Sequence, residues 1–275
     1  MGEQAAKDML RKTGTDPKDI DVVICATVTP DMIFPDTANS IATAIGAEKA
    51  FGFDLGAACS GFIFALNTGA RLIESGAYKK ILVIGVDKMS SIVDYTDRTT
   101  CILFGDGAGC VLLERSENGE GFEDAVLHGD GAGAQYLYMR AGGSLHPASH
   151  ETVDKRLHFL RQEGRPVFKA AVKGMKDVTL ELLGKQNVKA DDLDWIVPHQ
   201  ANMRIINSLS DFLEVPKEKV MINIDRYGNT TAATIPLCLW DYEKQLKKGD
   251  QMILTAFGGG YTWGTIYMTW AYDSN

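Results

Sequence analysis

The feature that most constrains the fold of this chain is an internal duplication. The segment DPKDIDVVICATV (residues 16–28) parallels VKADDLDWIVPHQ (residues 188–200), and Ile20 matches Leu193 at a shift of 193 − 20 = 173 positions. Two further pairs of segments correspond at nearly the same shift: FDLGAACSGF (53–62) with INIDRYGNTT (222–231), and KKILVIGVD (79–87) with GDQMILTAFG (249–258). A chain that contains two copies of one unit is expected to fold as two similar halves related by a pseudo-twofold axis.

The order of elements within each copy predicts the fold class. Each copy alternates short apolar strand patterns, rich in β-branched residues, with longer helical patterns. This order is typical of mostly parallel sheets whose faces are covered by helices. We therefore predict an α/β protein made of two layered αβαβα halves, which are residues 1–121 and residues 122–275.

The two halves differ where they begin. The second half opens with a strand-like stretch at residues 122–128, whereas the matching strand of the first half would lie before Met1. A missing first strand predicts that the chain is an N-terminally truncated form of a longer protein. The alternative is that the two halves simply differ.

Composition and charge exclude several classes of protein. The net charge of −8 and the lack of a Lys/Arg stripe with interleaved aromatic residues argue against a nucleic-acid-binding protein. No apolar stretch approaches the length of a membrane span, and the N-terminus does not have the pattern of a signal peptide. The five cysteines show no CxxC spacing, which predicts reduced thiols in a cytoplasmic protein: Cys25, Cys59, Cys101, Cys110 and Cys238. His146, His150 and His158 lie in a polar loop without a Cys-containing frame, so we predict no metal site.

Cys59 lies in LGAACSGF (residues 55–62), where a short apolar strand turns sharply into a helical pattern. The Gly and Ala residues before it allow a tight turn. At a helix N-terminus the helix dipole and the unpaired N–H groups favour thiolate over thiol, which would make Cys59 a nucleophile. The competing interpretation is a buried structural cysteine, which we expect for the other four cysteines.

Two further polar residues lie at strand ends or turns. His199, in VPHQANMR (197–204), follows a short strand at the rim where sites form in parallel sheets. Asn229, in RYGNTTAA (226–233), lies in the second half's counterpart of the Cys59 turn. Each has a structural interpretation, as a hydrogen-bonded loop histidine and as a turn asparagine. The correspondence between the two turns favours function, because both would point into one central crevice.

Two segments are rich in glycine. In FGGGYTWG (257–264) the glycines can direct backbone N–H groups at a developing oxyanion, and the alternative is a flexible hairpin. The segment LFGDGAG (103–109) has neither the GxGxxG pattern nor a Walker lysine, so we predict no nucleotide site there.

Five motifs together resemble the β-ketoacyl-acyl-carrier-protein synthase III family of thiolase-fold condensing enzymes: LGAACSGF, DRTTCILFGDGAG, VPHQANMR, RYGNTTAA and AFGGGYTWG. The likeness covers nearly the whole chain. It implies a thiolase-like fold in each half and an acyltransferase that initiates type II fatty-acid synthesis. It also implies a homodimer that needs no cofactor, with acyl-CoA and malonyl-acyl carrier protein as substrates.

The resemblance implies a role for each catalytic residue. Cys59 would take an acyl group from acyl-CoA as a thioester, and His199 and Asn229 would hydrogen-bond the thioester carbonyl of malonyl-acyl carrier protein during decarboxylation. The enolate-like charge needs donors rather than a base, which suits a neutral imidazole and an amide. The backbone N–H groups of Cys59 and Gly259 would form the oxyanion hole.

The resemblance also implies substrate-binding residues. Arg98 would contact the CoA adenine, and three residues would line the pantetheine path: Gly164, Phe168 and Asn202. Arg204 would meet the acidic face of the carrier protein, together with scattered lysines. Phe34 would reach across a dimer interface to close the partner's acyl pocket.

Three alternatives stay open. The first is a related synthase of secondary metabolism with a longer or branched primer. The second is a papain-like cysteine hydrolase, which would need a base positioned for attack by water. The third is a catalytically inactive scaffold.

Overall fold

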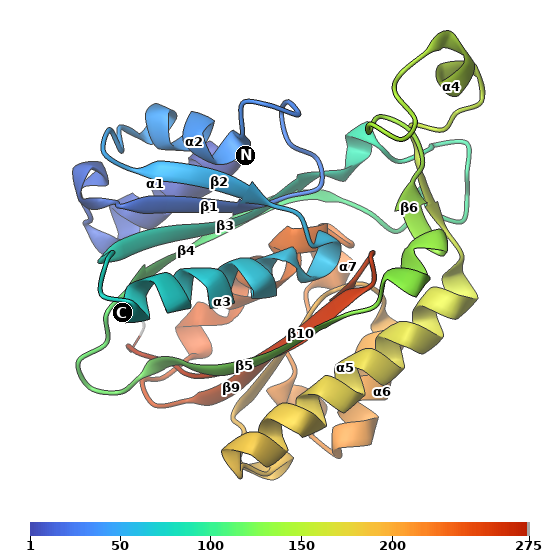
Figure 1. Ribbon diagram of the computed structural model, residues 1–275. Coiled ribbons are helices and arrows are strands. Elements are labelled where there is room, and N and C mark those ends of the chain that lie inside the picture. The colour runs from blue at the N-terminus through green and yellow to red at the C-terminus, as the bar shows by residue number, and fades with distance from the viewer. Residues whose placement is uncertain (274–275) are drawn as a thin grey trace.

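The computed structural model describes residues 1–273 and contains two four-stranded mixed sheets (Figure 1). The first sheet, in the order β2-β1-β3-β4, is made of β1 (Val22–Ala26), β2 (Phe51–Leu55), β3 (Lys80–Lys88) and β4 (Asp106–Glu114). The second sheet, in the order β5-β10-β9-β8, is made of β5 (Gly121–Gly129), β8 (Trp195–Pro198), β9 (Gln251–Gly258) and β10 (Thr262–Thr269). A separate small sheet pairs β6 (Leu137–Met139) with β7 (Leu160–Gln162).

Helices cover the outer face of each sheet and fill the space between the two sheets. The helices are α1 (Gly2–Thr13), α2 (Thr37–Ile45), α3 (Gly61–Glu74), α4 (His150–Asp154), α5 (Gly164–Gln186), α6 (Met203–Leu213), α7 (Ile224–Tyr227) and α8 (Thr234–Tyr242). Helices α1 and α2 pack on the first sheet and α5 and α6 on the second, while α3 lies between the sheets (Figure 1). The central hydrophobic core joins α3 and α8 to strands of both sheets. The predicted layered α/β architecture is therefore confirmed.

The strand register reproduces the sequence duplication. In the first sheet β1 pairs in parallel with β3, with Val22 opposite Ile81, and in the second β8 pairs in parallel with β9, with Trp195 opposite Met252. Each central strand then pairs antiparallel with the next, β3 with β4 and β9 with β10. The two halves thus share one strand order at their centres, as a pseudo-twofold axis requires.

Each half has one aspartate that accepts a backbone hydrogen bond at the start of a central strand. The Asp21 carboxylate accepts a hydrogen bond from the Lys80 backbone N–H at the start of β3. The Asp194 carboxylate accepts the same bond from the Gln251 N–H at the start of β9. Both copies of the sequence carry this aspartate. It therefore holds β1 and β3, and likewise β8 and β9, in the same register.

The outer edges of the two sheets differ. The strand expected at residues 122–128 is β5, which pairs antiparallel with β10. Within residues 1–273, β4 pairs with β3 alone among the strands of its sheet. Among the same residues we find no helix with both the length and the apolar character that a membrane span requires.

The Gly-rich and charged stretch between β5 and α5 folds into short elements. It contains a 3₁₀ helix at Gly131–Gln135, then β6, α4 and β7, and it projects beside the rim of both sheets (Figure 1). The β6–β7 pair runs directly into the start of α5, so this connection borders the site described next.

Candidate active site

Cys59 lies where β2 passes through a short 3₁₀ helix, Ala58–Ser60, into α3. Ala58 has a φ of 46°, which makes the turn sharp. The backbone of the opposite half approaches closely: a Cβ on Gly258 would lie 2.7 Å from the Cys59 nitrogen. Glycine at position 258 therefore allows the end of β9 to form one wall of the Cys59 turn.

The electrostatic environment of the Cys59 thiol differs from the sequence-based expectation. Burial, and to a smaller extent the charge of Asp87, raises the pKa of Cys59 to about 12. Hydrogen bonds from the backbone N–H groups of Cys59 and Gly259 lower this pKa, but by less than burial raises it. The expected preference for thiolate is overturned because desolvation disfavours the charged form more strongly than the helix N-terminus favours it. Cys59 is a neutral thiol at physiological pH.

His199 follows β8, and its backbone N–H donates to the Thr255 carbonyl oxygen at 2.8 Å. Its side chain is buried, with Nδ1 2.7 Å from the Thr234 hydroxyl oxygen. Nε2 is buried without a hydrogen-bond partner among residues 1–273. Burial lowers the pKa of His199 to about 3, so the imidazole is neutral at physiological pH.

Asn229 is fixed through both its backbone and its side chain. Its N–H donates to the Leu103 carbonyl oxygen at 2.9 Å, and its carbonyl oxygen accepts from the Gly105 N–H at 3.0 Å. Its side-chain oxygen accepts from the Thr231 N–H at 2.9 Å. With the oxygen engaged in this way, the amide NH₂ group is the end of the side chain left for a ligand.

The glycines of LFGDGAG explain how this turn comes so close to the first half. A Cβ at Gly105 would lie 2.2 Å from the Tyr227 carbonyl oxygen, and a Cβ at Gly107 would lie 2.9 Å from the Thr230 side chain. These glycines allow the 227–230 segment to pack directly on the backbone of the first half. The motif therefore positions Asn229 from the opposite half of the chain.

Cys59, His199 and Asn229 line one cavity of about 390 Å³. Each comes from a different part of the sequence, and the pseudo-twofold packing of the two halves brings them together. The three residues expected along the pantetheine path, and the residue expected to dock the carrier protein, line the same cavity: Gly164, Phe168 and Asn202, and Arg204. The guanidinium of Arg204 lies 5.1 Å from the centre of the Phe168 ring.

Two of the predicted substrate-binding residues lie outside this cavity wall. Arg98 is exposed, and its neighbour Thr99 lines the cavity in its place. Phe34 is 83% exposed in the loop that follows β1. Neither residue lines the cavity with Cys59, His199 and Asn229, so any role for them depends on a bound molecule or a second chain.

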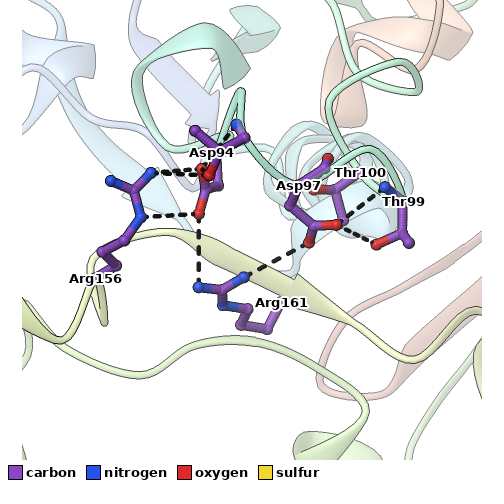
Figure 2. Close-up of polar contacts among 7 residues, drawn as sticks. Asp94, Asp97, Thr99, Thr100, Arg156 and Arg161 are labelled. Atoms are coloured by element: carbon purple, nitrogen blue, oxygen red, sulfur yellow. Dashed lines mark hydrogen bonds and ion pairs between the residues drawn. The ribbon is translucent and has the colours of Figure 1, made fainter.

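A cluster of charged residues fastens the β6–β7 connection beside the cavity (Figure 2). The buried Asp94 carboxylate pairs with Arg156 at 2.5 Å and with Arg161 at 3.6 Å. Arg161 also lies 3.6 Å from Asp97, whose carboxylate accepts hydrogen bonds from the backbone and side chain of Thr99. The cluster therefore ties the connection to the segment that supplies Thr99 to the cavity wall.

Sequence reasoning did not identify three residues that support the site. Thr234 contacts His199, and Asp87 accepts the backbone N–H of Ala232 close to Asn229. Gln200 points into the protein and bonds Pro198, Met221 and Asn223: its NH₂ group donates to two carbonyl oxygens and its oxygen accepts one N–H. Gln200 and Asp87 lie within motifs noted in the sequence, but only their burial reveals what they do.

The geometry agrees with comparisons against known proteins. The family described as 3-oxoacyl-[acyl-carrier-protein] synthase III matches residues 53–131, and its C-terminal counterpart matches residues 183–270. A curated β-ketoacyl-[acyl-carrier-protein] synthase III from Phocaeicola vulgatus is 54% identical over 275 residues, which is 100% of this chain and 82% of that protein.

Solved structures give the same result. The 3-oxoacyl-[acyl-carrier-protein] synthase III of Aquifex aeolicus VF5 superposes with a TM-score of 0.90 at 42% identity, over 98% of this chain and 83% of that one. The corresponding enzyme of Pseudomonas aeruginosa PAO1 gives a TM-score of 0.91 at 36% identity, over 100% and 83% of the two chains. With motifs, cavity geometry, sequence and fold in agreement, the chain belongs to the 3-oxoacyl-[acyl-carrier-protein] synthase III family of thiolase-fold condensing enzymes.

Proposed function

We propose that the chain catalyses the initiating condensation of fatty-acid synthesis, with Cys59 as the acyl acceptor. In this reaction an acyl group passes from acyl-CoA to Cys59 and then to malonyl-acyl carrier protein. The observation that carries the proposal is the presence of Cys59, His199 and Asn229 on one cavity wall. The family membership established above favours this reaction over a synthase of secondary metabolism.

In the acylation step the Cys59 sulfur attacks the carbonyl carbon of acyl-CoA. A new carbon–sulfur bond forms, the bond to CoA breaks, and CoA leaves as a thiol with the proton that Cys59 has lost. The N–H groups of Cys59 and Gly259, which hydrogen-bond the Cys59 sulfur, lie where they can stabilise the oxyanion of the tetrahedral intermediate. Since the resting thiol has a pKa of about 12, its proton leaves as the sulfur attacks.

In the condensation step malonyl-acyl carrier protein loses CO₂, and the electron pair of the broken bond gives an enolate. The enolate carbon attacks the acyl carbonyl on Cys59, and the Cys59 sulfur leaves and takes up a proton. His199 Nε2 and the Asn229 amide are suited to stabilise the enolate oxygen. Both are held in place by other hydrogen bonds, and the low pKa of His199 keeps its imidazole a neutral donor.

The carrier protein would dock beside α5 and α6. Arg204 stacks on Phe168 at the cavity wall, and the exposed Lys169 lies one position after Phe168. Positive side chains at a cavity rim suit the acidic face of a carrier protein. The substrate would then extend past Gly164 and Asn202 toward Cys59.

We also propose a cytoplasmic homodimer. The side chain of Phe34 is exposed at the tip of a loop, which supports a role at an interface with a second copy.

All five cysteines are free thiols, which suits a reducing compartment. Arg98 is exposed next to Thr99 of the cavity wall, which supports a role in binding the nucleotide end of CoA.

Intact-protein mass spectrometry after incubation with a panel of acyl-CoAs tests the proposal. The wild type should gain the mass of one acyl group, and Cys59→Ala should gain none, whereas Cys101→Ala, outside the cavity wall, should acylate normally. His199→Ala and Asn229→Ala should acylate but fail to condense. Normal acylation of Cys59→Ala would show that the assignment of the nucleophile is wrong.

A further inference from the structure

Asp87 is a buried carboxylate that the proposed mechanism does not use. It lies in β3 near the end of the strand and is fully buried. One of its oxygens accepts hydrogen bonds from Thr27 Oγ1 at 3.1 Å, Val28 N at 2.8 Å, and Thr29 N and Oγ1 at 3.2 and 3.0 Å. The other oxygen accepts from the Ala232 N–H at 3.2 Å. Asp87 thus joins the loop after β1 to the turn that carries Asn229 in the other half.

The duplication shows what is unusual about this position. In the parallel pairs Val22 lies opposite Ile81, and its counterpart Trp195 lies opposite Met252. Asp87 follows Ile81 by 87 − 81 = 6 positions, and Gly258 follows Met252 by 258 − 252 = 6 positions. Gly258 is therefore the counterpart of Asp87. The 3₁₀ helices Ala58–Ser60 and Thr231–Ala233 are likewise counterparts.

The two turns share their backbone geometry as well as their position. Ala58 and Thr231, which are 173 positions apart, both have positive φ values of 46° and 55°. The next residue in each turn is Cys59 in one half and Ala232 in the other. The structural counterpart of Cys59 is therefore Ala232, and Asn229 lies three positions before it.

The backbone N–H groups of Cys59 and Ala232, which are equivalent in the two halves, make different contacts. At Ala232 the N–H donates to the Asp87 carboxylate. Among residues 1–273 no carboxylate accepts the Cys59 N–H, because Gly258 occupies the equivalent position and its backbone lies against the Cys59 nitrogen. In the first half the Cys59 N–H is left for the reacting oxyanion. In the second half the Ala232 N–H anchors the turn to Asp87.

We propose that Asp87 is a positioning residue that holds Asn229 in the geometry needed for condensation. Two hydrogen bonds connect Asp87 to Asn229. The Asp87 carboxylate accepts the N–H of Ala232, and the N–H of the preceding residue, Thr231, donates to the side-chain oxygen of Asn229. A carboxylate suits this task because it is an acceptor only, and every group that faces it is a donor. The inference rests on the role proposed above for Asn229.

The test separates condensation from acylation in the chain of 275 residues. Asp87→Asn keeps the shape of the side chain but places an NH₂ group among donors. We expect condensation with malonyl-acyl carrier protein to fall about 10- to 100-fold, as expected when an oxyanion donor is misplaced. Acylation of Cys59, followed by intact mass, should not fall by more than about threefold, because it does not use Asn229 and because removing the charge of Asp87 lowers the pKa of the Cys59 thiol.

Asp54→Asn is the matched control. The Asp54 carboxylate also accepts two backbone N–H groups, from Thr37 at 2.8 Å and Ala38 at 2.9 Å, but at the start of α2. Both reaction steps should be unchanged in this variant.

Equal loss of both steps in Asp87→Asn, or loss of neither, would overturn the inference. If Asp87→Asn does not fold, Thr29→Val removes one hydroxyl donor from the same carboxylate oxygen. That variant should show the same selective loss at about threefold, and equal effects on both steps would again overturn it. Normal condensation by Asn229→Ala alone would instead contradict the proposed function.

Discussion

Thr234 Oγ1 lies 2.7 Å from His199 Nδ1 and 3.2 Å from the carbonyl oxygen of Thr231. The hydroxyl has one hydrogen, so it donates either to the Thr231 carbonyl oxygen or to Nδ1; donation by His199 Nε2 to an enolate, as proposed above, requires it to donate to Nδ1. The imidazole hydrogen then lies on Nε2, the nitrogen without a partner among the described residues. Thr234 is therefore the side chain that holds the tautomer required by the proposed mechanism.

Replacing Thr234 tests this relationship. Thr234→Val keeps the shape but removes the hydroxyl, so His199 can place its hydrogen on Nδ1. Steady-state condensation should fall about 10- to 100-fold, while acylation of Cys59 remains. Thr234→Ser keeps the hydroxyl and should stay within about threefold of the wild type. Equal condensation rates for the valine and serine variants would contradict the assigned tautomer.

The buried thiol predicts an unusual pH profile for alkylation. Because the pKa of Cys59 is raised to about 12, its thiolate fraction rises tenfold per pH unit up to that value. Iodoacetamide labelling of Cys59, followed by peptide mass mapping, should therefore keep rising from pH 7 to pH 9. A plateau near pH 7 would show that the resting group is a thiolate. The Cys59→Ala variant identifies the labelled peptide.

The glycine at position 105 should be indispensable for placing Asn229. In Gly105→Ala the new methyl group would meet the Tyr227 carbonyl oxygen, 2.2 Å away, so the 227–229 segment must move. We expect a loss of about 1–3 kcal/mol in the free energy of unfolding, measured by urea titration, and weaker condensation.

Gly143→Ala is the control for that substitution. A Cβ at Gly143 meets nothing within 4 Å, so neither stability nor condensation should change. If both variants behave alike, close packing at Gly105 does not position the turn.

The charge cluster of Figure 2 should hold the β6–β7 connection in place. In Asp94→Asn, Arg156 and Arg161 lose the carboxylate that they share. We expect faster limited proteolysis within residues 137–162, with cleavage sites mapped by mass. Glu151→Gln breaks an exposed ion pair with Lys155 in the same connection and should have no effect.

The same cluster predicts the direction of a pH effect. Hydrogen bonding and charge from Arg156 hold the pKa of Asp94 well below its usual range. The stability from this group is therefore present above the ordinary carboxyl pKa of about 3.9 and is lost as the pH falls below it. The wild-type connection should become more sensitive to an acid-active protease as the pH falls below 4, whereas Asp94→Asn should be sensitive throughout. A wild type that stays resistant in acid would contradict this account.

The sequence by itself determined the architecture and the family. Two copies of one strand–helix pattern can bury their apolar faces only by packing as two similar layered halves, so the duplication fixed the α/β fold. The position of Cys59 at a strand-to-helix turn was readable because strand and helix patterns are local. The five motifs are also local stretches of sequence, so their order along the chain carried the family resemblance.

Only the tertiary structure decided how the site is supported. The contacts of Asp87 with Ala232 and of Arg156 with Asp94 join residues that are 145 and 62 positions apart. The direction of the Cys59 pKa shift depends on burial by the second half of the chain, which a local helix-terminus argument does not include. Composition and periodicity record which residues are apolar and how they repeat along the chain, whereas desolvation and hydrogen bonding depend on which distant segments pack together.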